Sequence, residues 1–210
     1  MRCVAISDTH GQHSSLQLPP GDLLIHAGDV AKAGGVNEIK DFLYWFAEQP
    51  HTHKVFIAGN HDFYFERAPE SEITTLIPDT IHYLNDSSTL IEGIKIHGSP
   101  VQPWFLDWAF NRQRGADIDR HWQLIPEDTD ILLTHGPPKN ILDTTFRMQS
   151  VGCEMLAAKI EAIRPKYNIF GHIHEAYGQL EQNGTTFINA SVLNLRYQLV
   201  NAPVVFDFVG

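Results

Sequence analysis

The sequence has little cysteine, no long apolar run and few basic side chains. Two cysteines in 210 residues, Cys3 and Cys153, cannot build a disulfide framework. No stretch approaches the roughly 20 apolar residues that a membrane helix needs, so no membrane partner is expected. Lys and Arg number 15 against 25 Asp and Glu, which gives a formal net charge of −10. A chain this acidic lacks the broad basic face with which proteins bind nucleic-acid polymers.

The beginning of the chain shows no targeting signal. Met1 and Arg2 lead directly into a short apolar run, Cys3–Ile6. A signal peptide needs an apolar run of roughly 7–15 residues. Together with the sparse cysteines, this predicts a cytoplasmic protein in a reducing compartment.

Short apolar runs alternate with helical patterns along much of the chain. Five runs are of strand length, and several are apolar on both parities, which is typical of strands buried on both faces. These runs are Cys3–Ser7, Leu23–Ala27, Val55–Ala58, Ile131–Thr134 and Tyr167–Phe170. Apolar residues at three- and four-residue steps predict helices over 36–46 and 153–163, with Ser150 as a candidate N-cap of the second. Such alternation indicates an α/β fold.

Hairpins follow in the later part of the chain. Asn183-Gly184 lies between two strand-like runs, 177–182 and 185–189, and is the strongest short hairpin signal. Gly93 separates two further runs, and a last strand is expected over 204–209. We therefore predict an α/β fold of two mixed β-sheets packed as a sandwich and flanked by helices. The length fits one domain over residues 1–210.

Histidine is abundant, with 12 residues, and it is the commonest metal ligand in proteins. Each of the five apolar runs ends in side chains that can bind a metal. These are Asp8 and His10, then Asp29, then Asn60 with His61 and Asp62, then His135, and finally His172 with His174. Because sites in α/β sheets form outside the carboxyl ends of the strands, parallel strands would bring all five groups to one edge.

The types of ligand indicate the metals and the reaction. Carboxylate, imidazole and amide donors suit Mn, Fe, Zn or Co, and manganese is favoured here. The absence of cysteine from the set argues against a structural zinc cluster. The set exceeds one tetrahedral site and fits two ions that share a carboxylate. Two divalent ions about 3.5–4 Å apart promote in-line displacement at phosphorus, and their charge would attract a phosphate ester.

The motifs resemble, in order, the D-x-H, G-D, G-N-H-D/E, H-G and G-H-x-H series of the calcineurin-like metallophosphoesterases. They stand here as Asp8-Thr9-His10, Gly28-Asp29, Gly59-Asn60-His61-Asp62, His135-Gly136 and Gly171-His172-Ile173-His174. The resemblance extends to the metallophosphoesterase-domain-containing subgroup through Gly98-Ser99-Pro100 and Phe187-Ile188-Asn189-Ala190-Ser191. It covers nearly the whole chain.

This resemblance implies a site for two divalent metal ions. One ion would be held by Asp8, His10, Asp29 and His174. The second would be held by Asp29, Asn60, His135 and His172, so that Asp29 bridges both. His61 would be the catalytic histidine, which stabilises transition-state charge or protonates the leaving oxygen. Asp62 would orient His61.

One departure from the superfamily's patterns argues against a protein phosphatase. The protein serine/threonine phosphatases carry G-D-x-x-D-R-G, and no Asp-Arg pair follows Gly28-Asp29 here. We expect a phosphodiesterase for small substrates such as nucleotides or cyclic nucleotides. Asn60, His61, Asn111 and Arg112 are the candidate substrate contacts. A phosphomonoesterase with the same site and a non-enzymatic nucleotide- or protein-binding module are the alternatives.

Overall fold

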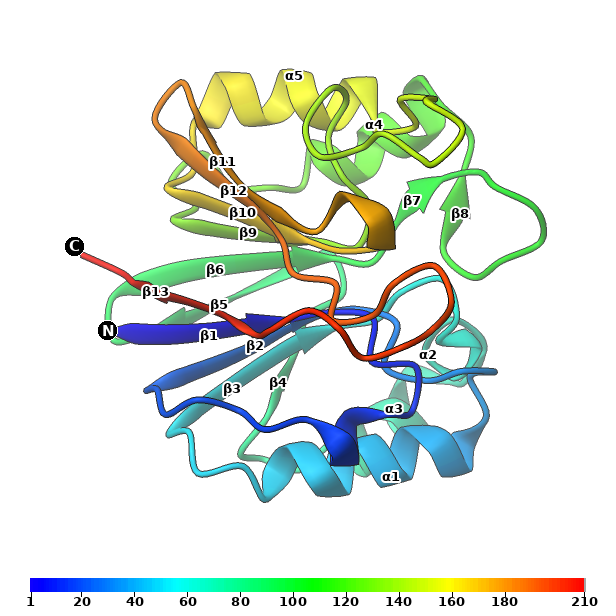
Figure 1. Ribbon diagram of the computed structural model, residues 1–210, viewed down its shortest axis with the longest axis vertical. Helices are drawn as coiled ribbons and strands as arrows, with labels where there is room; N and C mark the ends of the chain where they lie inside the picture. Colours follow the sequence, from blue (N-terminus) through cyan, green and yellow to red (C-terminus); the bar gives the residue numbers. More distant parts are fainter. Residues whose placement is uncertain (210) are drawn as a thin grey trace.

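Two β-sheets lie face to face between two layers of helices (Figure 1). The computed structural model describes residues 1–209, so Gly210, the last residue of the expected single domain, lies outside the described residues. Both sheets contain parallel and antiparallel neighbours. The predicted fold of two mixed sheets flanked by helices is therefore confirmed.

The first sheet is formed mainly by the amino-terminal part of the chain. In the order in which they pair, its strands are β13 (Val204–Asp207), β1 (Arg2–Ile6), β2 (Leu23–Ala27), β3 (His53–Ile57) and β4 (His82–Tyr83). β13 is antiparallel to β1, and the other pairs are parallel. The helices α1 (Val36–Ala47), α2 (Phe63–Arg67) and α3 (Glu70–Leu76) pack on its outer face. α1 buries Ile39, Leu43 and Phe46 at the predicted helical spacing.

The second sheet has a parallel centre and two antiparallel edges. Its strands pair in the order β11 (Gly178–Gln182), β12 (Thr185–Asn189), β10 (Tyr167–Phe170), β9 (Ile131–Thr134), β6 (Ile94–Ser99) and β5 (Ser87–Ile91). The edge strands β11 and β5 are the antiparallel ones. Helices α4 (Ala116–Trp122) and α5 (Glu154–Ile163) cover its outer face, where Trp122 and Leu156 are buried.

The turns and helix ends show where local sequence determines structure. Asn183 and Gly184 have φ values of 53° and 84°, as a tight hairpin turn requires. α5 begins one residue after Cys153, so the expectation of Ser150 as its N-cap is wrong. Ser150 instead donates its hydroxyl to Asp143 (2.5 Å). Short elements that the periodicity did not indicate include α2, α3 and β4, together with β7 (Gln102–Pro103), β8 (Asn111–Arg112), η1 (His13–Ser15) and η2 (His174–Ala176).

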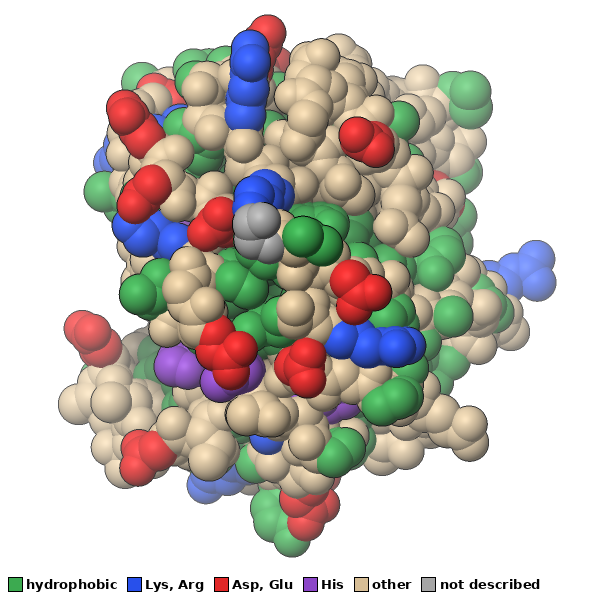
Figure 2. Space-filling view, turned by 90° about the vertical axis from the view of Figure 1, so that its left-hand side faces the viewer, with side chains coloured by type: hydrophobic (Ala, Val, Ile, Leu, Met, Phe, Trp, Pro, Cys, Tyr) green, Lys and Arg blue, Asp and Glu red, His purple; other side chains and the backbone are tan. Residues whose placement is uncertain are grey.

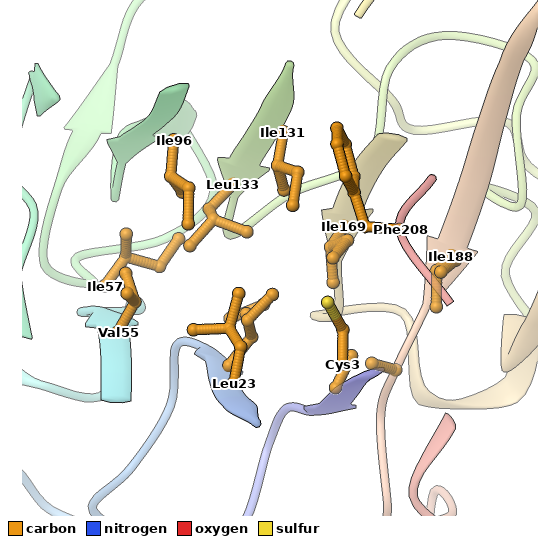
Figure 3. Close-up of a cluster of buried hydrophobic side chains, with 14 of the residues drawn as sticks. Cys3, Leu23, Val55, Ile57, Ile96, Ile131, Leu133, Ile169, Ile188 and Phe208 are labelled. Carbon is orange, nitrogen blue, oxygen red and sulfur yellow. The ribbon is translucent and has the colours of Figure 1, made fainter. Parts of the chain in front are cut away.

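Aliphatic side chains from both sheets fill the space between them (Figure 3). Leu23, Val55 and Ile57 on the first sheet meet Ile96 and Leu133 on the second. All five are fully buried, and burying each such side chain contributes roughly 1.5–3 kcal/mol. Cys3 belongs to the same cluster, and burial raises the pKa of its thiol to about 11. This thiol is therefore a packing group rather than a nucleophile.

The parallel strands bring their carboxyl ends to the right-hand side of Figure 1. The sheets join there, because the Ser7 N–H that follows β1 donates to the carbonyl of Ala190 after β12 (2.9 Å).

Figure 2 shows the opposite end, where basic side chains are scattered among acidic ones. Within residues 1–209, none of the helices is both long enough and apolar enough to cross a membrane.

Candidate metal centre

Asp8 lies immediately beyond β1, and its side chain is fully buried. Both of its carboxylate oxygens accept the backbone N–H of His172, each at 3.1 Å. Its Oδ1 lies 3.4 Å from Nε2 of His174. The first and the last motif in the sequence therefore meet at one carboxylate.

Asp29, beyond β2, lies between two imidazoles. Its Oδ2 is 3.5 Å from Nε2 of His10 and 3.4 Å from Nε2 of His135. Its Oδ1 accepts the backbone N–H of His61 at 2.8 Å. One carboxylate thus contacts groups from both sheets, which is the position that a bridging ligand needs.

Three groups of side chains bring possible ligand atoms within 4.8 Å of one another. They are Asp8 with His10 and His174, His10 with Asp29 and His61, and Asp29 with His135 and His172. The amide of Asn60 extends the last group, since its Oδ1 lies 2.9 Å from Nε2 of His135. The structure therefore brings together all seven residues expected as ligands from the sequence.

Two further observations fit a cation at this site. Both ring nitrogens of His10 are buried, and neither has a hydrogen-bond partner among residues 1–209. Buried polar atoms are rarely left unpaired, so a ring nitrogen of His10 is suited to bind a metal ion. His135 and His174 donate Nδ1–H to the carbonyls of Ala27 (3.0 Å) and Asn194 (3.2 Å), which directs Nε2 toward the carboxylates. Metal-binding histidines are commonly held in this way.

The electrostatics of the site favour positive charge. Burial alone would raise the pKa of Asp8 and Asp29, but His174 and His135, respectively, hold these pKa values below the usual range. Burial alone would lower the pKa of His135 and His174, yet Asp29 and Asp8 raise both to about 9. The two buried carboxylates are therefore held in the ionised form that can bind a cation.

The backbone at the site is strained. Asp8, His10, Asp29 and His172 have φ values of 56°, 41°, 56° and 67°, in the left-handed region that residues other than glycine rarely occupy. Such residues concentrate at functional sites, where the surrounding structure holds them in place. Close packing leaves no room for a side chain at Gly59, where an added Cβ would lie 2.3 Å from Oδ1 of Asp29.

His61 stands beside the carboxylates and is held from two sides. Its Nδ1 donates to the carbonyl of Lys32 at 2.8 Å. Its ring stacks on that of Trp108, with centroids 4.1 Å apart and planes inclined by 29°. The ring also meets that of His10 edge-on, with centroids 4.5 Å apart. These contacts present a half-buried imidazole to the open side of the site.

Asp62 is placed differently from what the sequence suggested. Its carboxylate accepts the N–H groups of Gly59 (2.8 Å), Val30 (3.2 Å) and Ala31 (2.9 Å). The hydrogen-bond partner of the His61 ring is Lys32 instead. Burial and then the Asp29 carboxylate raise the pKa of Asp62 to about 7, against the effect of the three N–H donors. Asp62 therefore ties the loops after β2 and β3 together.

The side chains of Asn111 and Arg112 contact other residues of the protein and are not part of the group of metal ligands. The Asn111 amide donates to the carbonyls of Phe105 (3.2 Å) and Leu106 (2.8 Å). The Arg112 Nε donates to His121 at 3.0 Å, and a terminal nitrogen lies 3.8 Å from Glu66. Their side chains are engaged with the protein, so the structure does not bring them to the site as the sequence suggested.

The ligand groups border a cleft of about 190 Å³. Its walls also include residues that were not among the site residues predicted from the sequence, namely Phe105, Trp108, Glu175, Leu195 and Tyr197. Trp108 lies in a segment after Pro100 that is rich in tryptophan, and this composition was the only indication in the sequence that the segment could contribute to the site. Tyr197 packs against His10 and His174, with ring centroids 4.9 and 5.4 Å apart, and no local pattern marked it.

Comparison with known proteins identifies relatives over almost the whole chain. A family profile described as calcineurin-like phosphoesterase matches residues 1–176. The human metallophosphoesterase domain-containing protein 1 is 42% identical over 98% of this chain and 70% of its own length. The UPF0046 protein T07D4.2 of Caenorhabditis elegans is 37% identical over 99% of this chain and 60% of its own.

Solved structures share the fold at low sequence identity. The phosphopantetheinyl hydrolase of Mycobacterium tuberculosis aligns with a TM-score of 0.64 at 15% identity, over 93% of this chain and 90% of its own. The protein TT1561 of Thermus thermophilus aligns with a TM-score of 0.62 at 13% identity, over 90% and 88% of the two chains. With these matches and the ligand groups in view, the chain belongs to the calcineurin-like phosphoesterase family of metal-dependent phosphoester hydrolases.

Proposed function

We propose that the protein is a phosphodiesterase that hydrolyses small diesters, such as nucleotides or cyclic nucleotides, with two bound divalent metal ions. The position of Asp29 carries this proposal. One of its oxygens faces His10 and His135, and the other accepts the N–H of His61. A shared carboxylate beside a half-buried imidazole fits a two-metal hydrolytic site.

The two ions would divide the clustered side chains between them. Asp8, His10, Asp29 and His174 would hold one ion, and Asp29, Asn60, His135 and His172 the other. Oxygen and imidazole donors without thiolate suit Mn, Fe, Zn or Co, and we favour manganese. When bound, such a pair polarises the phosphoryl oxygens and lowers the pKa of the attacking water.

His61 would act on the leaving group. Its Nδ1–H is engaged with the Lys32 carbonyl, so Nε2 is the nitrogen free for substrate. In the protonated ring, Nε2–H would donate its proton to the oxygen of the departing alcohol. The neutral ring would then regain a proton from solvent. Asp62 supports this role indirectly, because it fixes the loop that carries His61.

The charge of the cleft supports a diester over a monoester. Its lining residues, as far as the structure describes the chain, include Glu175 but no lysine or arginine. A monoester brings up to two negative charges and a diester one. The metal ions would bind the first negative charge of either ester, but no lysine or arginine lines the cleft to bind the second charge of a monoester, which supports the diester. Both cysteines are free and buried, which supports a cytoplasmic location.

The test is hydrolysis of bis(4-nitrophenyl) phosphate against 4-nitrophenyl phosphate by metal-stripped protein that has been reloaded with manganese. We expect faster cleavage of the diester, and we expect chelation to abolish it. Faster cleavage of the monoester would assign a phosphomonoesterase. Bound metal without cleavage of either ester would favour the binding module.

A further inference from the structure

A second cavity adjoins the metal cleft. It has a volume of about 370 Å³, and its walls include Trp104, Phe105, Pro137, Val151 and Ile173. Phe105 and His172 line both this cavity and the metal cleft. The two spaces therefore lie next to each other.

The metal cleft is smaller than typical small-molecule sites. Its volume of about 190 Å³ lies below the roughly 300–1,000 Å³ of typical small-molecule sites. The adjoining cavity, at about 370 Å³, lies within that range. A phosphoryl group at the metals would therefore leave its larger substituent to be held elsewhere, and this cavity is next to it.

The lining of the cavity suits an uncharged group. Among the described residues, the only basic side chain in its walls other than His172 is Arg114, which is already engaged. Arg114 donates to the carbonyls of Val151 (2.6 Å) and Gly152 (2.8 Å) and pairs with Glu154 (2.5 Å). A charged substituent would lose its hydration there without gaining an unpaired partner, which is unfavourable.

Aromatic and polar features of the walls define the substituent further. Trp104 and Phe105 are 52% and 54% exposed, so two aromatic faces stand open to solvent beside the cavity. The hydroxyl of Thr145, another wall residue, is buried without a hydrogen-bond partner among residues 1–209. A planar ring could cover the aromatic faces, and a polar atom on that ring could pair with the hydroxyl.

We propose that this cavity binds an uncharged aromatic substituent of the phosphodiester, and that it is the substituent retained after cleavage. The inference rests on the proposed function. The retained group is assigned because His61, which would protonate the leaving oxygen, lines the metal cleft but not the cavity. The preferred substrate is then a diester with an aryl group or nucleobase on the retained side.

Two substrates with one leaving group test this assignment. Phenyl 4-nitrophenyl phosphate and methyl 4-nitrophenyl phosphate both release 4-nitrophenolate, so they differ in the retained group. The variant Trp104→Ala removes a wall of the cavity. Leu106→Ala is the matched control, because Leu106 lies in the same loop at 56% exposure and lines neither space.

We expect the ratio of kcat/KM for the phenyl diester to that for the methyl diester to fall about tenfold in Trp104→Ala. The same ratio should stay within about twofold of the wild type in Leu106→Ala. An unchanged ratio in Trp104→Ala, or an equal fall in both variants, would overturn the assignment.

Calorimetric binding of phenylphosphonate and methylphosphonate to the manganese-loaded protein separates this inference from the proposed function. We expect tighter binding of phenylphosphonate, and we expect Trp104→Ala to remove the difference. That result without hydrolysis of either diester would overturn the phosphodiesterase and leave the aromatic site standing. Hydrolysis with equal binding of the two phosphonates would overturn the aromatic site alone.

Discussion

The imidazole of His61 stacks on the indole of Trp108, with ring centroids 4.1 Å apart. The two residues come from different loops, which are joined because the N–H of Ala109 donates to the carbonyl of Asn60 (3.0 Å). On its other side, His61 is fixed by the Lys32 carbonyl. Trp108 is therefore a positioning residue for the imidazole that faces the cleft.

Trp108→Ala should lower kcat for diester hydrolysis by about tenfold with a smaller change in KM. Losing a group that orients a functional side chain typically costs 10- to 100-fold. Trp108→Phe keeps an aromatic face and should recover most of the rate. Steady-state kinetics with metal analysis checks this, and a loss of bound metal in Trp108→Ala would show that Trp108 acts on the ligands instead.

His61→Ala should reduce turnover in a way that depends on the leaving group. General acid catalysis contributes about 10²–10⁴-fold when the departing alcohol needs a proton. The loss should be near that range for an alkyl leaving group and much smaller for 4-nitrophenolate, which departs readily without one. Equal losses for both leaving groups would mean that His61 does not protonate the leaving oxygen.

Much of the scaffold could be predicted because its signals are local. A few neighbouring residues determine each of these elements, namely the strands β1, β2, β9 and β10 and the turn at Asn183-Gly184. Parallel pairing aligns the ends of β1 and β2 in the first sheet and those of β9 and β10 in the second. The packing of the two sheets then brings Asp8, Asp29 and His135 together.

The rest depends on loop paths that short patterns do not encode. Arg112 suits a phosphate, yet it lies against His121 and Glu66. Asp62 follows His61 in the sequence, yet its carboxylate binds N–H groups of two loops. In each case a partner distant in the sequence determines where the side chain points. Trp108 reaches His61 for the same reason.

Gly59→Ala should destabilise the protein and weaken metal binding. Its Cβ would lie 2.4 Å from the backbone nitrogen of Asp29 and 2.7 Å from the ring of His135. Overpacking of this kind costs typically 1–3 kcal/mol. Gly35→Ala is the control, because no atom lies within 4 Å of its added Cβ. Denaturant unfolding and metal titration would test both, and equal effects would contradict the account.

His97 should make stability depend on pH. It is buried under the helices of the second sheet, where its Nδ1 meets the Ser88 hydroxyl at 2.9 Å. Burial lowers its pKa from 6.5 to about 4, with Asp86 acting in the opposite sense and Lys159 in the same sense. As the pH falls through 6.5, His97 gains a proton in the unfolded chain but stays neutral in the folded protein. Protonation therefore stabilises the unfolded chain, and the free energy of unfolding decreases.

The expected loss of unfolding free energy from this histidine is on the order of 3 kcal/mol between pH 6.5 and pH 4. Above pH 6.5 both states are neutral at this position, so the contribution is constant there. His97→Gln should lose correspondingly less stability over the same interval. Urea unfolding of both metal-free proteins at pH 7 and pH 4.5 checks this, and parallel losses in the two proteins would exclude the assignment.

The most direct measurement for the two-metal site is the metal content and diesterase rate of one manganese-reloaded sample, for the wild type and for Asp29→Asn. The variant keeps the side-chain shape and removes the charge between His10 and His135. We predict about two ions per wild-type chain and, in the variant, fewer ions, a retained fold and turnover lower by about 100-fold or more. A single ion in the active wild type, or near-wild-type turnover in Asp29→Asn, would contradict the shared-carboxylate site.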